Sequence, residues 1–495
     1  MQRSFGWLRR TRGCLLLWCV IFPAFIRGEK LPVSALQEDF RIARSALEEA
    51  HGGIYRYTSK AEMDRTFDGA YRKIDRPMID LELWRLMAPA VAQIKCGHTF
   101  LWFPKALQAQ FETTIPLCPL EVRVFGSRAY IYQDLSRTGG DLEGSELLSL
   151  NGVPMKRLLT QLEGVFTGDG NTAVKAWRIG HIGGFTVYLY GLGVEAPFLV
   201  TYPARDGKRR TAELAGMKLV DRRKAWDARN PRPETTNADL KFLNDGKTAV
   251  LTIRHWYQYA DEERKLTFLD FLKNSFSQMR TNGSKSLIID VRDNDGGLDA
   301  PGKQLFAFLW DRPFYYDEKL VINARQFDFF KYDPEAKPIR ADIVEQQPDG
   351  RFRLGKHPNV GVQQPAEPHF AGKVYVLMNG GSFSTSCEFL ATLHFHKRGI
   401  FIGEEPAGGY YGCTAGRFVQ LELPNSKLIL RFGLTTYYQA VSGYKRDRGV
   451  LPDFPVTHTI VDLISGRDRD MDLALSLVQR PDVSRGNGQK APARH

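Results

Sequence analysis

The chain has 495 residues, which is too long for a single hydrophobic core and predicts about two to four domains. Its 43% hydrophobic and 25% charged residues are those of an ordinary globular protein. The formal net charge is +12, but five arginines and no acidic residue lie in the first 28 residues, which leaves about +7 for the rest. These charges are scattered and form no basic stripe interleaved with aromatic residues, so we expect no nucleic-acid partner.

Residues 1–28 have the pattern of a secretory signal. Arg9, Arg10 and Arg12 precede an apolar run over 14–26 that is broken by Pro23 and is short for a membrane span. No good small-x-small cleavage site precedes Glu29, so an uncleaved membrane anchor is the alternative to a cleaved signal peptide. We expect a protein of the bacterial cell envelope (periplasm) or a secreted one, with membrane contact only through such an anchor.

Three regions are predicted after the leader. Residues 29–115 have helical periodicity, with apolar positions at Leu36, Phe40 and Leu47. Residues 116–237 are predicted to be β-rich, because apolar residues alternate and an Asn151-Gly152 turn is present. The segment over 230–237 contains proline and asparagine and reads as a linker.

Residues 238–478 are predicted to form an α/β core. Short apolar runs bounded by turns are typical of buried parallel strands, and helical patterns separate them. The runs are Ala249–Ile253, Ser286–Val291 and Val374–Met378, and the helical patterns are Phe268–Met279, Gly302–Leu309 and Ser386–His396. Residues 311–370 are predicted to be an insertion or lid outside this core, and residues 479–495 a polar, disordered tail.

A serine turn at 379–386 is the first candidate for chemistry. The predicted strand runs into Gly380-Gly381, and Ser384 stands just before a helix, where free N–H groups and a partial positive charge suit a nucleophile whose attack creates an oxyanion. The alternative is that Ser382, Ser384 and Ser386 only cap the helix.

Paired glycines after the second strand are the next candidate. Gly296-Gly297 would allow backbone N–H groups to approach a substrate carbonyl, whereas a plain tight turn is the alternative. A calcium loop is excluded, because with Gly296 in the sixth place neither the first nor the twelfth place has a side-chain oxygen.

His98 follows Gly97 at the end of a predicted helix and is the candidate general base. The other histidines show no metal-ligand spacing and the chain has no HExxH or CxxC motif, so the sequence predicts no metal and no cofactor. Two of the six cysteines lie in the leader, and the other four (Cys96, Cys118, Cys387, Cys413) allow three disulfide pairings between which the sequence does not choose.

Together these segments resemble the C-terminal processing, or tail-specific, serine peptidases, a family that also includes the tricorn core and the interphotoreceptor retinoid-binding protein. The strand-turn LIIDVRDNDGG, the turn NGGSFSTSCEF, then FIGEEPAGG and GVLPDFPV occur in the family's order, and GSELLSLNGVP is similar to part of a PDZ-like domain. The resemblance implies crotonase/ClpP-like ββα units in the α/β core, an inserted PDZ-like domain and a peptide or unfolded-protein substrate. It implies no oligomeric state.

The family's motifs carry site residues onto this sequence. Ser384 matches the nucleophile, and the amides of Thr385 and of Gly296 or Gly297 match the oxyanion hole. Most members of the family use a lysine as the base, but the position of that lysine is Gly409 in this sequence, so the Ser–Lys pattern is absent. Gly97-His98-Thr99 instead resembles the tricorn-like branch, in which a histidine is the base. Candidates for the orienting acid are Glu404, Glu405 and Asp447, of which we favour Glu404.

We therefore expect a serine-type endopeptidase that works through an acyl-enzyme on Ser384. The main alternative is a non-catalytic carrier of apolar ligands on the same fold, in which the aromatic residues of 311–370 would line a cavity. A thiol enzyme using Cys387 is a remote third option, since a cysteine at that place is more simply packed.

Overall fold

The computed structural model describes residues 28–136, 142–172, 184–231 and 236–480. The leader over 1–27 and most of the tail over 479–495 lie outside the described residues, as does the middle of the predicted linker. No described helix combines the length and the apolar character needed to cross a membrane. All four cysteines of the described residues are free and buried.

A six-stranded sheet forms the α/β core, in the order β22-β19-β18-β12-β9-β8. All neighbouring pairs are parallel except β8 and β9, which confirms the predicted, largely parallel sheet. Helix α9 joins β9 to β12, α10 follows β12, and α11 joins β18 to β19. The bounds are β8 Ala238–Leu243, β9 Thr248–Ile253, α9 Phe268–Asn282, β12 Ser286–Asp290, α10 Asp299–Ala307, β18 Lys373–Met378, α11 Thr385–Phe395, β19 Ile400–Gly403 and β22 Phe454–Pro455.

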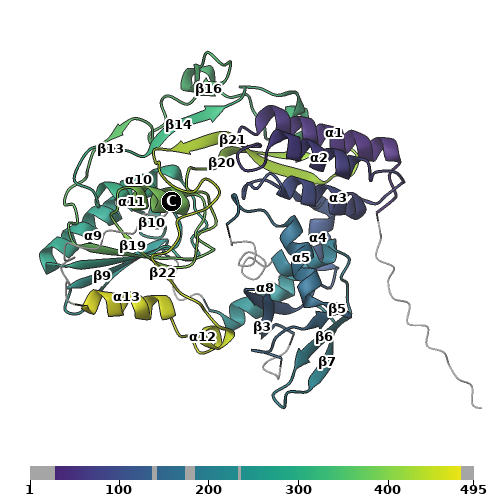
Figure 1. Cartoon of the computed structure of the whole chain (residues 1–495), viewed down its shortest axis with the longest axis horizontal. Helices are drawn as coiled ribbons and strands as arrows, with labels where there is room; N and C mark the ends of the chain where they lie inside the picture. The colour runs from purple at the N-terminus through teal and green to yellow at the C-terminus, as the bar shows by residue number, and fades with distance from the viewer. Residues whose placement is uncertain (1–27, 137–141, 173–183, 232–235, 481–495) are drawn as a thin grey trace, which may run out of the picture.

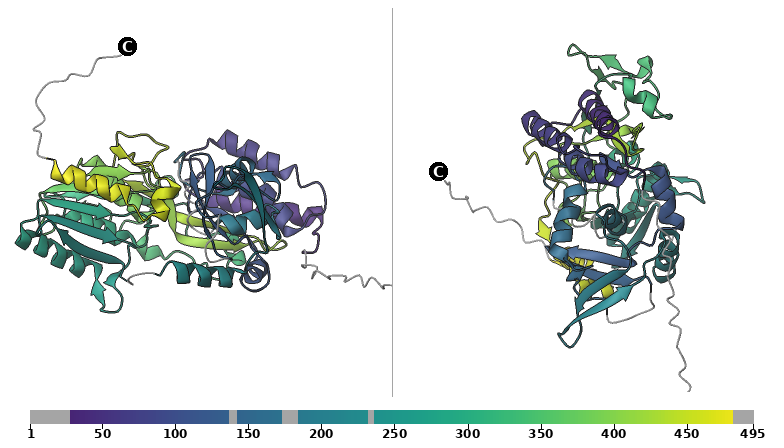
Figure 2. Two further views of the ribbon diagram at one scale, coloured as in Figure 1. Left: turned by 90° about the horizontal axis from the view of Figure 1, so that it is seen from below. Right: turned by 90° about the vertical axis from the view of Figure 1, so that its right-hand side faces the viewer.

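Both faces of this sheet are buried, which explains why its strands are continuous apolar runs. Leu251, Leu287 and Val376 pack toward α9, α10 and α11, whereas the alternate residues Ile288 and Tyr375 pack toward α13 (Arg469–Gln479). Figure 1 and Figure 2 show α13 and α9 on opposite faces of the sheet. The short helix α12 (Ile460–Ile464) precedes α13.

A second, antiparallel sheet joins the N-terminal helices to the C-terminal half of the chain. Its order is β1-β21-β14-β16-β15, and β20 pairs with β21. The helices predicted over 33–94 are present, and they share one hydrophobic core with this sheet (Figure 1). The bounds are α1 Val33–Ala50, α2 Lys60–Tyr71, α3 Asp80–Ala92, β1 Phe100–Trp102, α4 Lys105–Thr113, β14 Asp317–Ile322, β15 Glu345–Gln346, β16 Phe352–Arg353, β20 Thr414–Glu422 and β21 Ile429–Gln439.

Much of the segment over 311–370, which was predicted to be an insertion or lid outside the α/β core, belongs to the second sheet and its hydrophobic core. Strand β14 pairs with β21, and its Leu320 and Ile322 are buried in the core. Phe327 and Phe329, which would line the cavity of an apolar carrier, are also buried core residues. They stack on one another with ring centroids 5.1 Å apart. Proline and aspartate are typical of loops, so the composition of this segment did not indicate a strand. Strand β14 forms by pairing with β21, which is distant in the chain. The segment also contains β13 (Phe314–Tyr315), β17 (Val362–Gln363) and two short 3-10 helices, Asp328–Tyr332 and Ala341–Ile343.

The region predicted as a β-rich domain over 116–237 contains both small antiparallel sheets and helices, and its bounds as a domain stay a prediction. A hairpin of β2 and β3 is followed by a four-stranded sheet in the order β5-β4-β6-β7. Figure 1 shows this part beside the N-terminal helices and away from the parallel sheet. The bounds are β2 Leu120–Phe125, β3 Arg128–Asp134, β4 Ser149–Leu150, β5 Val153–Pro154, α5 Met155–Val165, α7 Gly184–Gly191, β6 Phe198–Pro203, β7 Arg209–Leu214 and α8 Leu219–Arg229, with β10 (Tyr259–Asp261) and β11 (Leu266–Thr267) later in the chain.

Candidate active site

Two turns meet at the carboxyl edge of the parallel sheet, where β12 and β18 end side by side. Asn294, in the turn after β12, is fully buried and joins them. Its carbonyl accepts hydrogen bonds from the Phe383 amide (3.0 Å) and from the Ser386 hydroxyl (2.9 Å). Its side chain donates to the Ile253 carbonyl at 2.9 Å and accepts from the Gly296 amide at 3.0 Å. Ligand sites in open α/β sheets lie at this edge.

Of the three serines in the 379–386 turn, two have structural roles. The Ser382 hydroxyl donates to the Val291 carbonyl at 2.7 Å. The Ser386 hydroxyl accepts from the Trp256 indole at 2.7 Å and donates to Asn294. Both side chains therefore hold the turn together.

Ser384 is different. It occupies the N-cap position of α11, yet its side chain makes no capping hydrogen bond. Its backbone has φ 55° and ψ −121°, a combination rare for a residue with a side chain and worth of order 1–3 kcal/mol in strain. The capping alternative therefore does not account for Ser384, whose half-buried hydroxyl is turned elsewhere.

His98 faces that hydroxyl. Its Nε2 atom lies 3.2 Å from Ser384 Oγ, although the two residues are 286 positions apart in the chain. Strand β1 begins two residues after His98 and pairs with β21, which carries the N-terminal segment to the edge of the α/β core. The imidazole stacks between two rings, at 4.4 Å from Phe383 and 5.8 Å from Phe418. The Arg431 guanidinium lies 3.7 Å from the Phe418 ring and donates to the His98 carbonyl at 3.3 Å.

The predicted oxyanion donors lie around Ser384, but they differ in what they can offer. The Gly296 amide already donates to Asn294, whereas those of Gly297 and Thr385 donate to no described residue. Gly296 and Gly297 have φ of 110° and 149°, and a Cβ on Gly296 would lie 2.6 Å from the Ser384 Cβ. Glycine is therefore required at position 296 for this close approach.

Asp169 is a buried carboxylate next to His98 that the sequence did not suggest. One oxygen of Asp169, one ring nitrogen of His98 and the Cys96 sulfur all lie within 4.8 Å of one another. The Gly97 amide donates to Asp169 Oδ1 at 2.6 Å, and the Gly409 amide donates to Oδ2 at 3.3 Å. Asp169 lies in a loop after α5, and no sequence signal connects that loop with His98.

The acids proposed from the sequence have other surroundings. Burial raises the pKa of Glu404, whose carboxylate lies near the Gly380 amide and His458. Glu405 forms a two-pronged ion pair with Arg448 at 2.8 and 2.6 Å. The half-buried Asp447 accepts a hydrogen bond from the Asn171 side chain at 2.7 Å, which lowers the pKa of Asp447. The role of Glu404 as orienting acid stays a prediction.

Cys387 is packed inside the fold. Its thiol is buried, donates to the Ser382 carbonyl at 3.3 Å and accepts from the Gly408 amide at 3.1 Å. These contacts hold the serine turn in place. They favour a packing role for Cys387 over the role of a nucleophile in a thiol enzyme.

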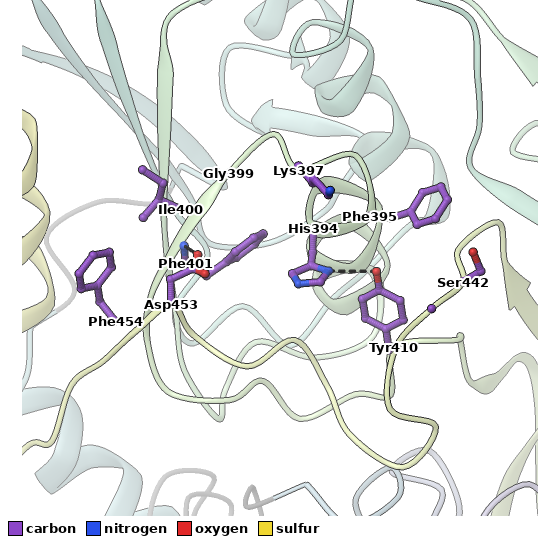
Figure 3. A pocket seen from close by; sticks show the side chains of 11 residues that line it. His394, Phe395, Lys397, Gly399, Ile400, Phe401, Tyr410, Ser442, Asp453 and Phe454 are labelled. Atoms are coloured by element: carbon purple, nitrogen blue, oxygen red, sulfur yellow. Dashed lines mark hydrogen bonds between the residues drawn. The ribbon is translucent and has the colours of Figure 1, made fainter. Parts of the chain in front are cut away.

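A separate cavity of about 830 Å³ lies at the opposite end of α11 (Figure 3). His394, Phe401, Tyr410 and Asp453 are among the residues that line it. The His394 ring bonds to the Tyr410 hydroxyl at 3.0 Å, and the Asp453 carboxylate accepts from the Phe401 amide at 2.9 Å. The His394, Tyr410 and Asp453 side chains of this cavity thus have hydrogen-bond partners, and the serine–imidazole pair lies elsewhere.

A serine at a strand-to-helix turn, an imidazole at hydrogen-bond distance and nearby backbone amides together define the kind of site found in serine hydrolases. Residues 247–456, which include this turn, match the model of peptidase family S41. The matched segment belongs to that family of C-terminal processing peptidases, and the chain is a serine-type peptidase. This confirms the resemblance stated above.

Comparison of folds points the same way. The chain is similar to mature CPAF, with a TM-score of 0.59 and 15% identity over 90% of this chain and 97% of that one. It is also similar to a mutant of CPAF (TM-score 0.61, 14% identity, 88% and 95% covered) and to mature CPAF complexed with lactacystin (0.60, 16%, 90% and 98%). Identities this low show a shared fold. No curated protein matches the sequence.

Proposed function

We propose that the chain is an exported endopeptidase in which Ser384 is the nucleophile and His98 the general base. The observation that carries this proposal is the 3.2 Å separation of His98 Nε2 and Ser384 Oγ. A nucleophile can pass its proton to a general base only when the two groups lie within hydrogen-bond distance of each other.

In the proposed reaction, Ser384 Oγ attacks the peptide carbonyl carbon while its proton passes to His98 Nε2. The amides of Gly297 and Thr385 hold the resulting oxyanion, and each such donor is worth about 10²–10³ in rate. His98 then protonates the leaving amine as the C–N bond breaks, which leaves an acyl-enzyme on Ser384. Water, deprotonated by His98, hydrolyses the ester and restores the hydroxyl.

We assign the orienting role to Asp169 in preference to Glu404. Asp169 is buried beside His98. The Gly97 and Gly409 amides each donate a hydrogen bond to one of its two carboxylate oxygens and so fix its orientation. A fixed carboxylate would stabilise the imidazolium that forms during the attack. The test is the pH profile of acylation in Asp169→Asn, Glu404→Gln and Asp447→Asn. We expect a loss of at least about 10²-fold and an altered pH profile only for Asp169→Asn, whereas a larger effect in Glu404→Gln would restore the first assignment.

We further propose that residues 116–229 act as a PDZ-like module that receives a peptide end. Strand β7 is the last strand of its sheet, and most of its residues are exposed, so an extended peptide could add beside it. The ββα order of β8, β9 and α9 is consistent with a crotonase/ClpP-like core. The basic, apolar leader supports a location in the cell envelope or outside the cell.

The proposed activity is tested with an unfolded protein and with peptide libraries as substrates. We expect wild-type protein to cleave internal peptide bonds and Ser384→Ala to be inactive while keeping the fold. Ser476→Ala is the matched control, because it removes an exposed hydroxyl on α13 that bonds only to the Leu473 carbonyl. An inactive wild type whose Ser384 is nevertheless acylated would require a different acyl substrate.

A further inference from the structure

Three ligand-type side chains surround the proposed base. Cys96 and His98 flank Gly97 between α3 and β1, and Asp169 approaches from the loop after α5. One sulfur, one nitrogen and one carboxylate oxygen lie within 4.8 Å of one another, and all three residues are buried. The peptidase reaction proposed above uses His98 and Asp169 but assigns nothing to the thiol.

We infer that Cys96, His98 and Asp169 form an inhibitory binding site for Zn²⁺. Thiolate, imidazole and carboxylate are the three ligand types that zinc takes in proteins, at about 2.0–2.3 Å. Three protein ligands leave a fourth, tetrahedral position for water. In such a geometry the ligand atoms stand roughly 3.5 Å apart, so the three atoms need to close in by about one ångström from their widest separation.

The surroundings of the three residues support a prearranged site. Asp169 is 1% exposed and held by the Gly97 and Gly409 amides, which fixes its orientation. Cys96 is 5% exposed, and its thiol donates to the Thr414 carbonyl at 3.4 Å. Ordering of metal ligands by neighbouring hydrogen bonds is typical of protein metal sites. No sequence motif marks this set, because Asp169 is distant from Cys96 and His98 in the chain.

Zinc at this site would block acylation through either nitrogen of His98. Bound at Nε2, the metal would replace the hydrogen bond to Ser384. Bound at Nδ1, it would leave the proton of the neutral ring on Nε2, the atom that must accept the serine proton. This inhibitory effect rests on the proposed function, whereas binding of the metal does not.

Binding is tested first with Co²⁺, which takes zinc sites and shows a thiolate-to-metal absorption band. The full chain carrying Ser384→Ala is titrated, so that the readout is independent of activity. We expect the band in this protein and in a version with Cys118→Ser, a control that removes a buried thiol outside the cluster. Cys96→Ser should abolish the band, and Cys96→Ala repeats the test if the serine variant does not fold. A band unchanged by loss of Cys96, or no band at all, overturns the inference.

Inhibition is tested by fluorophosphonate labelling of otherwise wild-type protein. We expect micromolar Zn²⁺ to slow labelling of Ser384 at least tenfold, and a chelator to reverse this. Cys96→Ser should label normally without metal and resist Zn²⁺. Equal inhibition of Cys96→Ser overturns the inhibitory role. A cobalt band in a protein that never labels would contradict the proposed function while supporting the metal site.

Discussion

Gly97 lies beside the ring of Phe383, so that a Cβ at Gly97 would stand 2.7 Å from the Phe383 Cζ. Gly97 precedes the proposed base and Phe383 precedes the proposed nucleophile, so this contact sets the distance between the two segments. A side chain at position 97 has no room unless the Phe383 ring moves.

Substitution Gly97→Ala should therefore separate His98 from Ser384. The added methyl group must displace Phe383, on whose ring the imidazole stacks. We expect the acylation rate to fall by about 10²-fold, the effect of a misplacement of about 1 Å, and the free energy of unfolding to fall by about 1–3 kcal/mol. Rates of fluorophosphonate labelling and urea denaturation measure the two effects.

Gly69→Ala is the matched control for that substitution. Gly69 lies within α2, and a Cβ there meets nothing within 4 Å. Because alanine favours a helix over glycine, the control should gain up to about 1 kcal/mol in stability and keep full activity. Full activity in Gly97→Ala would show that the Phe383 contact does not position the site.

Asn294→Ala should damage both the fold and the reaction. It leaves the Gly296 amide and the Ile253 carbonyl without their side-chain partner in a buried place. The free energy of unfolding should fall, because an unsatisfied buried group costs about 1–3 kcal/mol. The turn would also no longer fix the position of the Gly297 amide, so kcat should fall more than KM rises. As a control, Asn230→Ala removes side-chain bonds to Gln133 and Trp226 and should cost stability alone. A kcat that survives the loss of Asn294 would argue against this oxyanion arrangement.

The free energy of unfolding should depend on the protonation of Asp317, the first residue of β14. Its carboxyl group accepts a hydrogen bond from the Gln439 side chain. Burial raises its pKa to about 8, and the nearby Asp299 adds to the rise. The unfolded carboxyl titrates near pH 3.9. Since the folded state favours the protonated form, this contribution is full at low pH and is lost as the pH rises from about 4 to 8.

The free energy of unfolding of wild-type protein should thus fall between pH 5 and pH 8, by at most about 1.4 kcal/mol per pH unit for this carboxyl. Asp317→Asn should flatten that dependence in denaturation experiments. The exposed Asp349, whose pKa is lowered by the Arg351 side chain, titrates below this window, so Asp349→Asn should leave the slope unchanged. Parallel curves for wild type and Asp317→Asn would contradict a raised pKa.

The α/β core could be predicted from the sequence because its signals are local. The strand over 286–290 and the helix over 268–282 are apolar runs and periodic patterns bounded by turn residues. Strand β14 was missed because its place depends on pairing with β21, more than a hundred residues later. Periodicity reports which face is apolar, but it does not report the partner that covers that face.

The candidate site was predictable in part for the same reason. Ser384 and the glycine pair lie at strand ends, where the local pattern marks them. The meeting of Ser384 with His98 depends on β1 pairing with β21, and only the resemblance to a known family pointed to it. No local sequence pattern identifies Asp169, because its closeness to His98 arises from tertiary packing between residues that are distant in the chain.

Activity-based labelling tests the central claim most directly. Purified wild-type protein is treated with a fluorophosphonate, alongside Ser384→Ala, His98→Ala and the control Ser476→Ala, and the labelled peptide is located by mass spectrometry. We expect one label on Ser384 in the wild type and in Ser476→Ala, and none in the other two proteins. A label on another residue, or labelling of Ser384 that survives His98→Ala at the wild-type rate, would contradict this claim.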